Sequence, residues 1–170
     1  MRVSSLEAIF RALNEAQAEY LVVGGVAVIA HGHVRYTHDL DLVLSLSSPR
    51  LSNALSALKA LGFRPRIPVD ALDFANAANR AQWQEEKGMI VFNLFSDQIH
   101  DVSIDIFPSE PFDFTVEYAR AKMHPLTADV TVPIVSLPRL MVMKREAGRP
   151  QDLIDLDKLG KVQGINNASI

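Results

Sequence analysis

The chain of 170 residues is 48% hydrophobic and contains no cysteine, which excludes a disulfide framework and a thiolate site. Its length supports one sizeable core, so we expect a single domain over residues 1–163. The formal net charge of −3 argues against a broad basic surface that wraps nucleic acid, and no apolar run reaches membrane-spanning length. Because the N-terminus also lacks a secretion signal, we expect a cytoplasmic protein without membrane contact.

The N-terminal segment predicts a helix, a strand and a second helix. Residues 4–7 form a capping box, and apolar residues then recur at helical spacing: Leu6, Ile9, Phe10 and Leu13. Residues 20–23 indicate a buried strand, the glycine pair at 24–25 a tight turn, and residues 26–31 a short helix. We expect the first helix to cover the sheet to which this strand belongs.

Gly24 and Gly25 stand just before the predicted second helix. Because glycine has no side chain, a ligand can approach the backbone N–H groups closely, and such groups at a helix start bind anions such as nucleotide phosphates. The alternative interpretation is an ordinary strand-to-helix turn. The acidic motif that follows favours the phosphate site.

That motif is Asp39-Leu40-Asp41, which begins a predicted strand over residues 39–46. Successive side chains of a strand point to opposite faces, so Asp39 and Asp41 share one face while Leu40 lies on the other. One strand therefore presents two carboxylates to a single point.

Two helices are predicted next. Ser48 and Pro49 fit the N-cap and first turn of a helix that ends before Gly62 and has one apolar face. Residues 71–86 are rich in Ala and Asn and also predict a helix.

Residues 89–95 and 102–107 predict a hairpin with a loop over residues 96–100. Asp105 lies at the centre of the second run, so we expect a third carboxylate inside the sheet. Gathered carboxylates repel one another, and hard divalent ions such as Mg²⁺ relieve that repulsion while also binding substrate phosphates. The three aspartates are therefore candidate metal ligands.

The C-terminal part predicts a strand over residues 130–135, a helix over 136–147 and a final helix from Arg149-Pro150 to about residue 159. Residues 164–170 are predicted to be a frayed tail. Lys144 lies on the first of these helices, and Asp152 and Asp155 share one face of the second. A lysine here can balance triphosphate charge, whereas the alternative is a salt-bridge network that orients the two helices.

The order of these features resembles the polymerase-β-like nucleotidyltransferase superfamily. Gly24 and Gly25 match its glycine signature, Asp39 and Asp41 its paired metal ligands, and Asp105 its third acid. The segment 140–156, with Lys144 and the pattern Arg-Pro-Gln-Asp-Leu-Ile-Asp, resembles the AbiEii-like branch, and the two blocks together span residues 21–159.

The resemblance implies an α/β (α+β) nucleotidyltransferase fold with a mixed β-sheet, flanking helices and a short C-terminal helical pair. It implies an enzyme that moves a nucleoside monophosphate from an NTP to an acceptor hydroxyl of RNA, protein or a small molecule. Asp39, Asp41 and Asp105 would hold two Mg²⁺ ions, Gly24 and Gly25 the phosphates, and Lys144 would complete the catalytic set. Members of this branch include toxins of toxin–antitoxin pairs, so an antitoxin protein is a possible partner.

Other interpretations of these residues stay open. Arg35 precedes the acidic motif and is a candidate phosphate ligand. The neighbouring histidines, His31, His33 and His38, make a transition-metal hydrolase site a competitor, although strand parity places His38 opposite the aspartates. Trp83 is a candidate base-stacking platform or a core residue. A binding or regulatory module of the same fold without catalysis is the alternative function.

Overall fold

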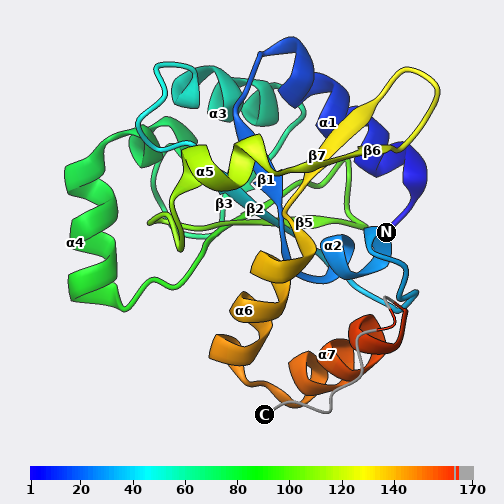
Figure 1. The fold of residues 1–170 in the computed structure, drawn as a ribbon. Helices are drawn as coiled ribbons and strands as arrows, with labels where there is room; N and C mark the ends of the chain where they lie inside the picture. The colour runs from blue at the N-terminus through cyan, green and yellow to red at the C-terminus, as the bar shows by residue number, and fades with distance from the viewer. Residues whose placement is uncertain (163, 165–170) are drawn as a thin grey trace.

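The protein is described by a computed structural model for residues 1–162 and Gly164. Seven strands form one mixed sheet in the order β3-β4-β5-β2-β1-β7-β6 (Figure 1). The strands are β1 Tyr20–Val22, β2 Asp39–Leu44, β3 Arg64–Pro65, β4 Phe92–Phe95, β5 Ser103–Ile106, β6 Lys122–Pro125 and β7 Thr131–Ile134. Strand β1 runs antiparallel to β2 and parallel to β7, and β2 runs parallel to β5. The predicted fold class, a mixed sheet with flanking helices, is confirmed.

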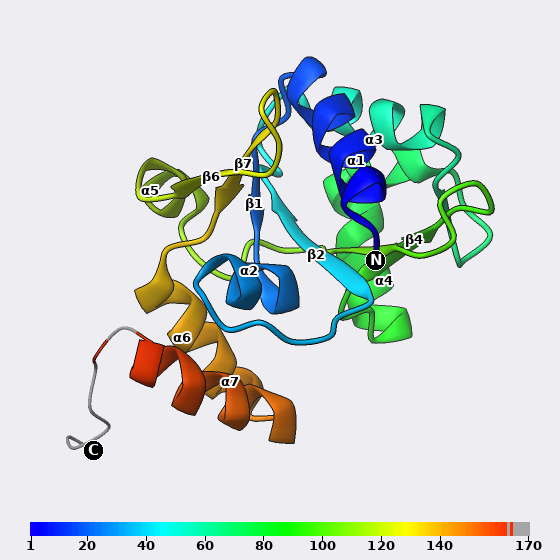
Figure 2. The same cartoon turned by 90° about the vertical axis from the view of Figure 1, so that its right-hand side faces the viewer.

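The helices lie around this sheet in separate groups. They are α1 Val3–Glu15, α2 Gly24–Ala30, α3 Leu51–Ala60, the 3₁₀ helix η1 Ala71–Ala75, α4 Ala77–Lys87, α5 Phe114–Ala119, α6 Leu137–Ala147 and α7 Pro150–Val162. Helices α1 and α3 lie side by side, and α6 and α7 form a pair that stands apart from them beyond α2 (Figures 1 and 2). The predicted C-terminal helical pair is therefore present.

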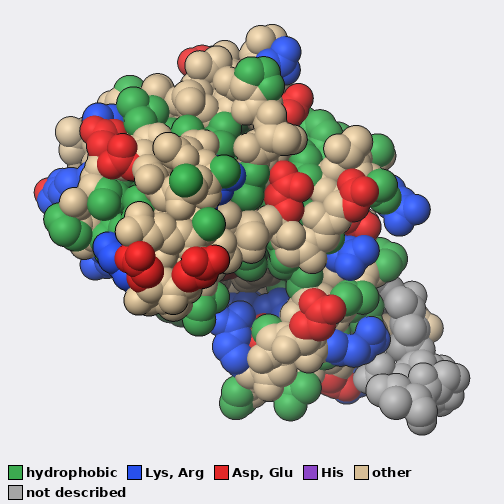
Figure 3. Space-filling view, turned by 90° about the vertical axis from the view of Figure 1, so that its left-hand side faces the viewer, with side chains coloured by type: hydrophobic (Ala, Val, Ile, Leu, Met, Phe, Trp, Pro, Cys, Tyr) green, Lys and Arg blue, Asp and Glu red, His purple; other side chains and the backbone are tan. Residues whose placement is uncertain are grey.

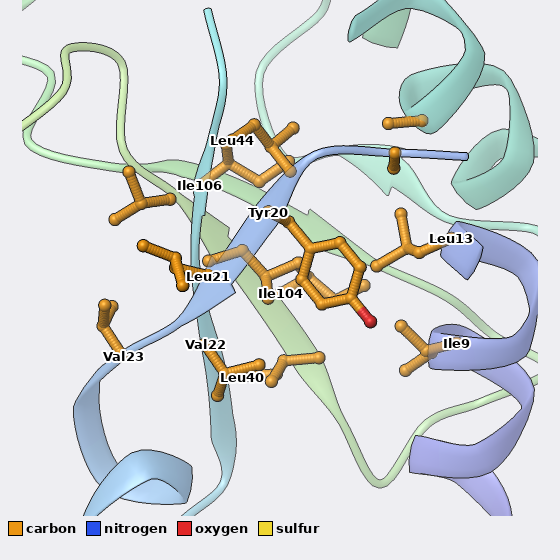
Figure 4. Close-up of a cluster of buried hydrophobic side chains, with 14 of the residues drawn as sticks. Ile9, Leu13, Tyr20, Leu21, Val22, Val23, Leu40, Leu44, Ile104 and Ile106 are labelled. Atoms are coloured by element: carbon orange, nitrogen blue, oxygen red, sulfur yellow. The ribbon is translucent and has the colours of Figure 1, made fainter. Parts of the chain in front are cut away.

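The core lies between the central strands and α1. Ile9 and Leu13 of α1 face Tyr20 of β1, and side chains from β2 and β5 complete the cluster (Figure 4). Residues 20–23 are all buried, as expected for a short, continuously apolar strand in the middle of a sheet. The core thus fixes β1, β2 and β5, the strands that lead into the glycine pair and carry the aspartates.

Two predicted helix starts are wrong. Helix α1 begins at Val3, before the expected capping box, and its N-terminus is held by Asp101, which accepts from the Arg2 N–H at 2.6 Å and the Ser5 hydroxyl at 2.8 Å. Helix α3 begins at Leu51, because Ser48 closes a turn with its carbonyl 3.1 Å from the Leu51 nitrogen. In both places a long-range contact or a local turn replaces the expected cap.

The predicted helix over residues 71–86 is two helices. Asn76 has extended backbone angles, and its side chain accepts from the Ala78 N–H at 2.9 Å, so it ends η1 and caps α4. The predicted hairpin is confirmed as β4 and β5, with shorter strands and a longer connection. The sequence did not predict β3, α5 or β6, which are short and mostly exposed at edges. Of the predicted tail, only Gly164 lies within the described residues.

Trp83 is a core residue, and the interpretation as a base-stacking platform is wrong. Its side chain is only 5% exposed and stacks on Phe92 of β4 with ring centroids 5.5 Å apart. Phe74 of η1 also stacks on Phe92, with ring centroids 4.7 Å apart. The three rings join η1 and α4 to the sheet.

We expect Trp83→Ala to lower the free energy of unfolding by about 3–5 kcal/mol, because truncation leaves a cavity beside Phe92. Ile90→Ala, at a side chain that is 81% exposed, should change it by less than about 0.5 kcal/mol. Chemical denaturation followed by circular dichroism gives both values. The core assignment would be contradicted if the Trp83→Ala protein kept its stability but failed to bind nucleotide, because the ring would then contact the ligand.

Candidate active site

The acidic residues of the sequence motifs meet on neighbouring strands. In the parallel pairing of β2 with β5, Asp41 lies opposite Asp105 and Asp39 lies opposite Ser103. The Ser103 hydroxyl donates to Asp39, and the Asn93 amide of β4 donates to Asp105. Asp39 is exposed, whereas Asp41 and Asp105 are partly buried. Register, which the sequence left open, brings the third acid beside the second.

Asp41 packs directly against the backbone at the start of α2. A Cβ atom added to Gly24 would lie 1.9 Å from the Asp41 Oδ2 atom, and Gly24 has a φ of +61°. The Gly25 N–H donates to the Asp41 carboxylate. A Cβ at Gly25 would in turn lie 2.5 Å from the Thr37 hydroxyl. Both glycines are therefore required by close packing of α2 on β2 and on the segment before it.

Asp41 and Asp105 have raised pKa values. Burial and the neighbouring Asp105 raise the pKa of Asp41 to about 6, although the Gly25 N–H and Lys144 favour its charged form. Burial also raises the pKa of Asp105, and repulsion from Asp39 adds to this, while the hydrogen bond from Asn93 and the charge of Arg66 oppose it. Carboxylates that resist ionisation in the ligand-free protein are typical of a site that a cation stabilises.

A cavity of about 160 Å³ separates this cluster from the C-terminal helices. Gly24 and Asp41 line one wall, and Lys144, Arg149 and Asp152 line the other. Figure 3 shows the hollow between the body of the molecule and the C-terminal pair, with Lys and Arg side chains on its sides. The cleft therefore has a carboxylate on the sheet side, and cations paired with acids on the helix side.

Lys144 lies in this cleft and also belongs to a buried salt-bridge network. Its ammonium is 2.7 Å from Asp152 Oδ1 and 2.8 Å from Asp155 Oδ2, and the residue is only 4% exposed. Burial is the largest single effect and opposes ionisation of both aspartates. The hydrogen bonds and charge of Lys144, together with the other polar and cationic partners of each carboxylate, outweigh it and hold both pKa values below their ordinary value. The two sequence interpretations of Lys144 are thus not exclusive. Loss of Lys144 should therefore also lower stability, because this residue neutralises buried charges.

Arg35 is part of the same network. Its guanidinium contacts Asp155 at 2.9 Å and 3.1 Å, and its Nη2 atom lies 3.0 Å from the place of a Cβ on Gly25. The side chain therefore lies beside the glycine pair, with its charge compensated by Asp155. It ties the segment before β2 to helix α7.

The described residues contain no group of three or more His, Cys, Asp or Glu side chains placed to hold a metal ion together. His31 instead bonds through its ring to the Val135 carbonyl at 2.8 Å, and His38 contacts the Tyr36 hydroxyl, so a histidine-rich metal site does not form here. Asp41 and Asp105 remain side by side as oxygen donors. This donor set suits Mg²⁺, which usually takes one or two carboxylates together with substrate phosphates.

Sequence reasoning missed the polar side chains that hold the acids. Asn93 and Ser103 each donate to an aspartate of the cluster, and Arg66 bonds to Asn93. The predicted hairpin was a usable signal, because Asn93 and Asp105 are opposite each other across it. Ser103 could be found only from the pairing of β2 with β5.

A family model described as "Nucleotidyl transferase AbiEii toxin, Type IV TA system" matches residues 7–170. The chain belongs to this family. The solved structures that resemble it are nucleotidyltransferases of the polymerase-β-like fold, and the family and fold together make it a nucleotidyltransferase. The predicted resemblance to the AbiEii-like branch is confirmed.

One similar structure is the lincosamide antibiotic adenylyltransferase LnuA with lincomycin bound, which has a TM-score of 0.63 and 14% identity over 94% of this chain and 96% of that one. Another is ANT(2")-Ia in complex with adenylyl-2"-tobramycin, with a TM-score of 0.58 and 17% identity over 96% of this chain and 93% of that one. A putative nucleotidyltransferase from Thermotoga maritima has a TM-score of 0.53 and 14% identity over 91% and 89% of the two chains. At these identities the likeness concerns the fold.

No protein of curated function matches the sequence. Within residues 1–162 and 164, none of the helices combines the length and the apolar character that a membrane crossing requires.

Gly24→Ala should abolish nucleotide binding and lower stability, because its methyl group would displace the Asp41 carboxylate. Gly88→Ala is the matched control, since Gly88 has a φ of +60° but no atom within 4 Å of an added Cβ. It should cost only the backbone penalty of about 1 kcal/mol. Calorimetric NTP titration and denaturation separate the two effects, and equal binding by both variants would contradict the tight contact at Asp41.

The raised pKa of Asp41 predicts that replacing this residue with a neutral one increases the stability of the protein, and that the increase depends on pH. The native carboxyl keeps its proton to about pH 6, against 3.8 for an unperturbed group, so the native state binds more protons between these values and stability falls as the pH rises through them. In EDTA, Asp41→Asn should therefore be more stable than wild type at pH 8, by up to about 3 kcal/mol, and nearly equal at pH 3.5. Denaturation at both pH values is the measurement. Glu85→Gln, at an exposed acid of α4, should show no such difference.

Proposed function

We propose that the protein transfers a nucleoside monophosphate from an NTP to an acceptor hydroxyl and that Mg²⁺ is required. The observation that carries this proposal is the placement of the partly buried Asp41 carboxylate between the glycine pair at 24–25 and Asp105, facing a cleft with cationic residues on its far wall. Nothing in the packing of the sheet requires uncompensated acids there. Family membership supports the same reaction.

Asp41 and Asp105 would hold the metal, with Asp39 as the third and more exposed ligand. A second ion at the same carboxylates is part of the proposal. When bound, Mg²⁺ supplies positive charge to the phosphate oxygens of the NTP and to the attacking oxygen. The chain's own contribution is to keep the carboxylates close together and partly dry, through Gly24, Ser103 and Asn93.

In the proposed reaction the acceptor oxygen forms a bond to the α-phosphorus of the NTP. The bond from this phosphorus to the bridging oxygen breaks, and pyrophosphate leaves with its electron pair. The hydroxyl proton passes to Asp105, whose raised pKa suits it to accept a proton, and then to water. The Gly24 and Gly25 backbone would bind the phosphates, while Lys144 and Arg149 would face the negative charge that develops on pyrophosphate. Arg35 would support the glycine segment.

The transfer test uses radiolabelled NTPs with Mg²⁺ and offers RNA, protein and small-molecule acceptors in parallel. Asp39→Asn and Asp41→Asn should lose transfer by at least about a hundredfold while remaining folded, because they remove ligand charge. Asp105→Ala should lose transfer yet keep most Mg²⁺–NTP affinity, since it serves the acceptor side. Near-wild-type turnover in the Asp41 variant, or NTP binding without any transfer by the wild type, would favour the non-catalytic alternative.

Lys144→Met should lower the free energy of unfolding by about 3–5 kcal/mol, because Asp152 and Asp155 stay buried without their common cation. Adding Asp152→Asn should restore part of this stability by removing one uncompensated charge. The folded double variant should still be slow in transfer if Lys144 acts on the phosphates. Turnover equal to that of Arg145→Gln, an exposed cation on the same helix, would limit Lys144 to its structural role.

Membership in a type IV toxin–antitoxin family favours a more specific role as the toxin of such a pair. An antitoxin protein is then the expected partner, and the cytoplasm, which holds the NTP pool, the expected location. Growth arrest on expression, lost in Asp41→Asn, would support this role. Full growth with active transfer in vitro would point to a small-molecule acceptor instead.

A further inference from the structure

A second cavity, of about 300 Å³, lies beyond the aspartate cluster at the β4–β5 side of the sheet. Ser103, which lines it, donates to Asp39, and His38, the residue before Asp39, lines it as well. The cavity is thus separate from the cleft that contains Asp41 and Lys144, and Ser103 connects it to Asp39 of the cluster. A group bound here would lie next to Ser103 and His38, the neighbours of Asp39.

Arg66 connects this cavity to the third acid. Its Nε atom donates to the Asn93 side-chain oxygen at 2.5 Å, and the amide of Asn93 donates to Asp105. The guanidinium also lies 5.1 Å from the ring centroid of Phe95, which lines the cavity with it. Arg66 is therefore one side chain away from the carboxylate that would serve the acceptor.

The two acids of this cavity have cations of their own. Asp97 pairs with Arg64 at 2.7 Å, and Asp101 pairs with Arg2 at 3.1 Å and accepts from Ser5. Arg66, in contrast, makes no ion pair with any residue of the described chain, since its partner Asn93 is neutral. The rings of His38 and His100 add further nitrogen atoms to the wall. Arg66 is thus the cavity cation whose charge no ion pair within the described chain takes up, although it also favours the charged form of Asp105.

We propose that this cavity is the acceptor subsite and that Arg66 binds a phosphate of the acceptor. The acceptor is then a phosphate ester with a free hydroxyl, and not a cationic amine. This inference rests on the proposed nucleotidyl transfer, whose acceptor it specifies. Arginine suits the role because its planar donors match phosphate oxygens and keep their charge at any physiological pH. The phosphate would hold the neighbouring hydroxyl against Asp39 and Asp105.

The test measures binding without turnover. A fluorescein-labelled single-stranded RNA with a 3′-hydroxyl is titrated with full-length wild type, Arg66→Gln, Arg66→Lys and Arg64→Gln, in Mg²⁺. Arg64 is the matched control, because its guanidinium also lies over Phe95, at 4.3 Å from the centroid, yet it is paired with Asp97 and does not line the cavity. We expect Arg66→Gln to weaken binding by about tenfold, Arg66→Lys to recover part of it, and Arg64→Gln to change it by less than about threefold.

Two competitors identify the source of the phosphate. If ribose 5-phosphate competes with an affinity equal to that of the RNA, the acceptor is a small phosphorylated sugar. If binding requires the oligonucleotide and weakens steeply with salt, the acceptor is a nucleic acid. Both results support the subsite. An RNA with neutral methylphosphonate linkages that binds as well as the natural one would overturn it. Equal losses of RNA affinity in Arg66→Gln and Arg64→Gln would also overturn it.

A transfer assay separates this inference from the function on which it rests. If the wild type adenylylates tobramycin and Arg66→Gln does so equally well, the phosphate subsite is wrong and the nucleotidyltransferase remains. If Arg66-dependent RNA binding is found but no acceptor is modified under any condition, the cavity binds phosphate and the proposed reaction fails. Circular dichroism and NTP titration should show that both glutamine variants keep the wild-type fold and NTP affinity.

Discussion

The contact between Asp41 and the backbone of Gly24 is the constraint on which the site depends. A single methyl group at Gly24 would overlap the carboxylate, so the start of α2 and the strand β2 can approach only because that position has no side chain. This approach partly buries Asp41, and burial beside Asp105 raises its pKa. The same packing therefore places backbone N–H groups beside an acid that needs a cation.

The acids around the cleft fall into two classes that differ in how their charge is balanced. Asp152 and Asp155 are fully buried but are neutralised by Lys144, Arg35 and Arg149, so they serve to attach the C-terminal pair to the rest of the molecule. Asp39, Asp41 and Asp105 receive only neutral hydrogen bonds and repel one another. Poorly compensated charge is costly inside a protein, and this is the physical basis of the cation proposed for the second group.

The neutral partners of the acidic cluster also connect it to its surroundings. Asn93 lies between Asp105 and Arg66, and Ser103 lies between Asp39 and the second cavity. A change near strands β4 and β5 can thus affect the carboxylates through one side chain. The solved relatives with lincomycin or adenylyl-tobramycin share the fold at low identity.

The sequence by itself determined the inner strands of the sheet, most helices and the residues of the motifs. Apolar runs mark buried strands, and the alternation of Asp39, Leu40 and Asp41 assigns both acids to one face, because these signals are local. Local signals failed where a residue distant in the sequence makes the contact, as at the start of α1, where Asp101 accepts hydrogen bonds from Arg2 and Ser5. They also failed for β3, α5 and β6, whose sequences are short and carry little apolar pattern.

Only the tertiary structure decided how the motifs meet. The register of β2 on β5 sets Asp105 beside Asp41, and it follows from the packing of the whole sheet rather than from either strand. Likewise, the sequence left Lys144 between a cleft cation and a salt-bridge residue. Folding of α7 against α6 gave it both surroundings, because the turn at Gly148 brings two buried carboxylates to an ammonium that also faces Asp41. Lys144, Asp152 and Asp155 form one ion-pair network only because the fold brings them together and excludes water from between them.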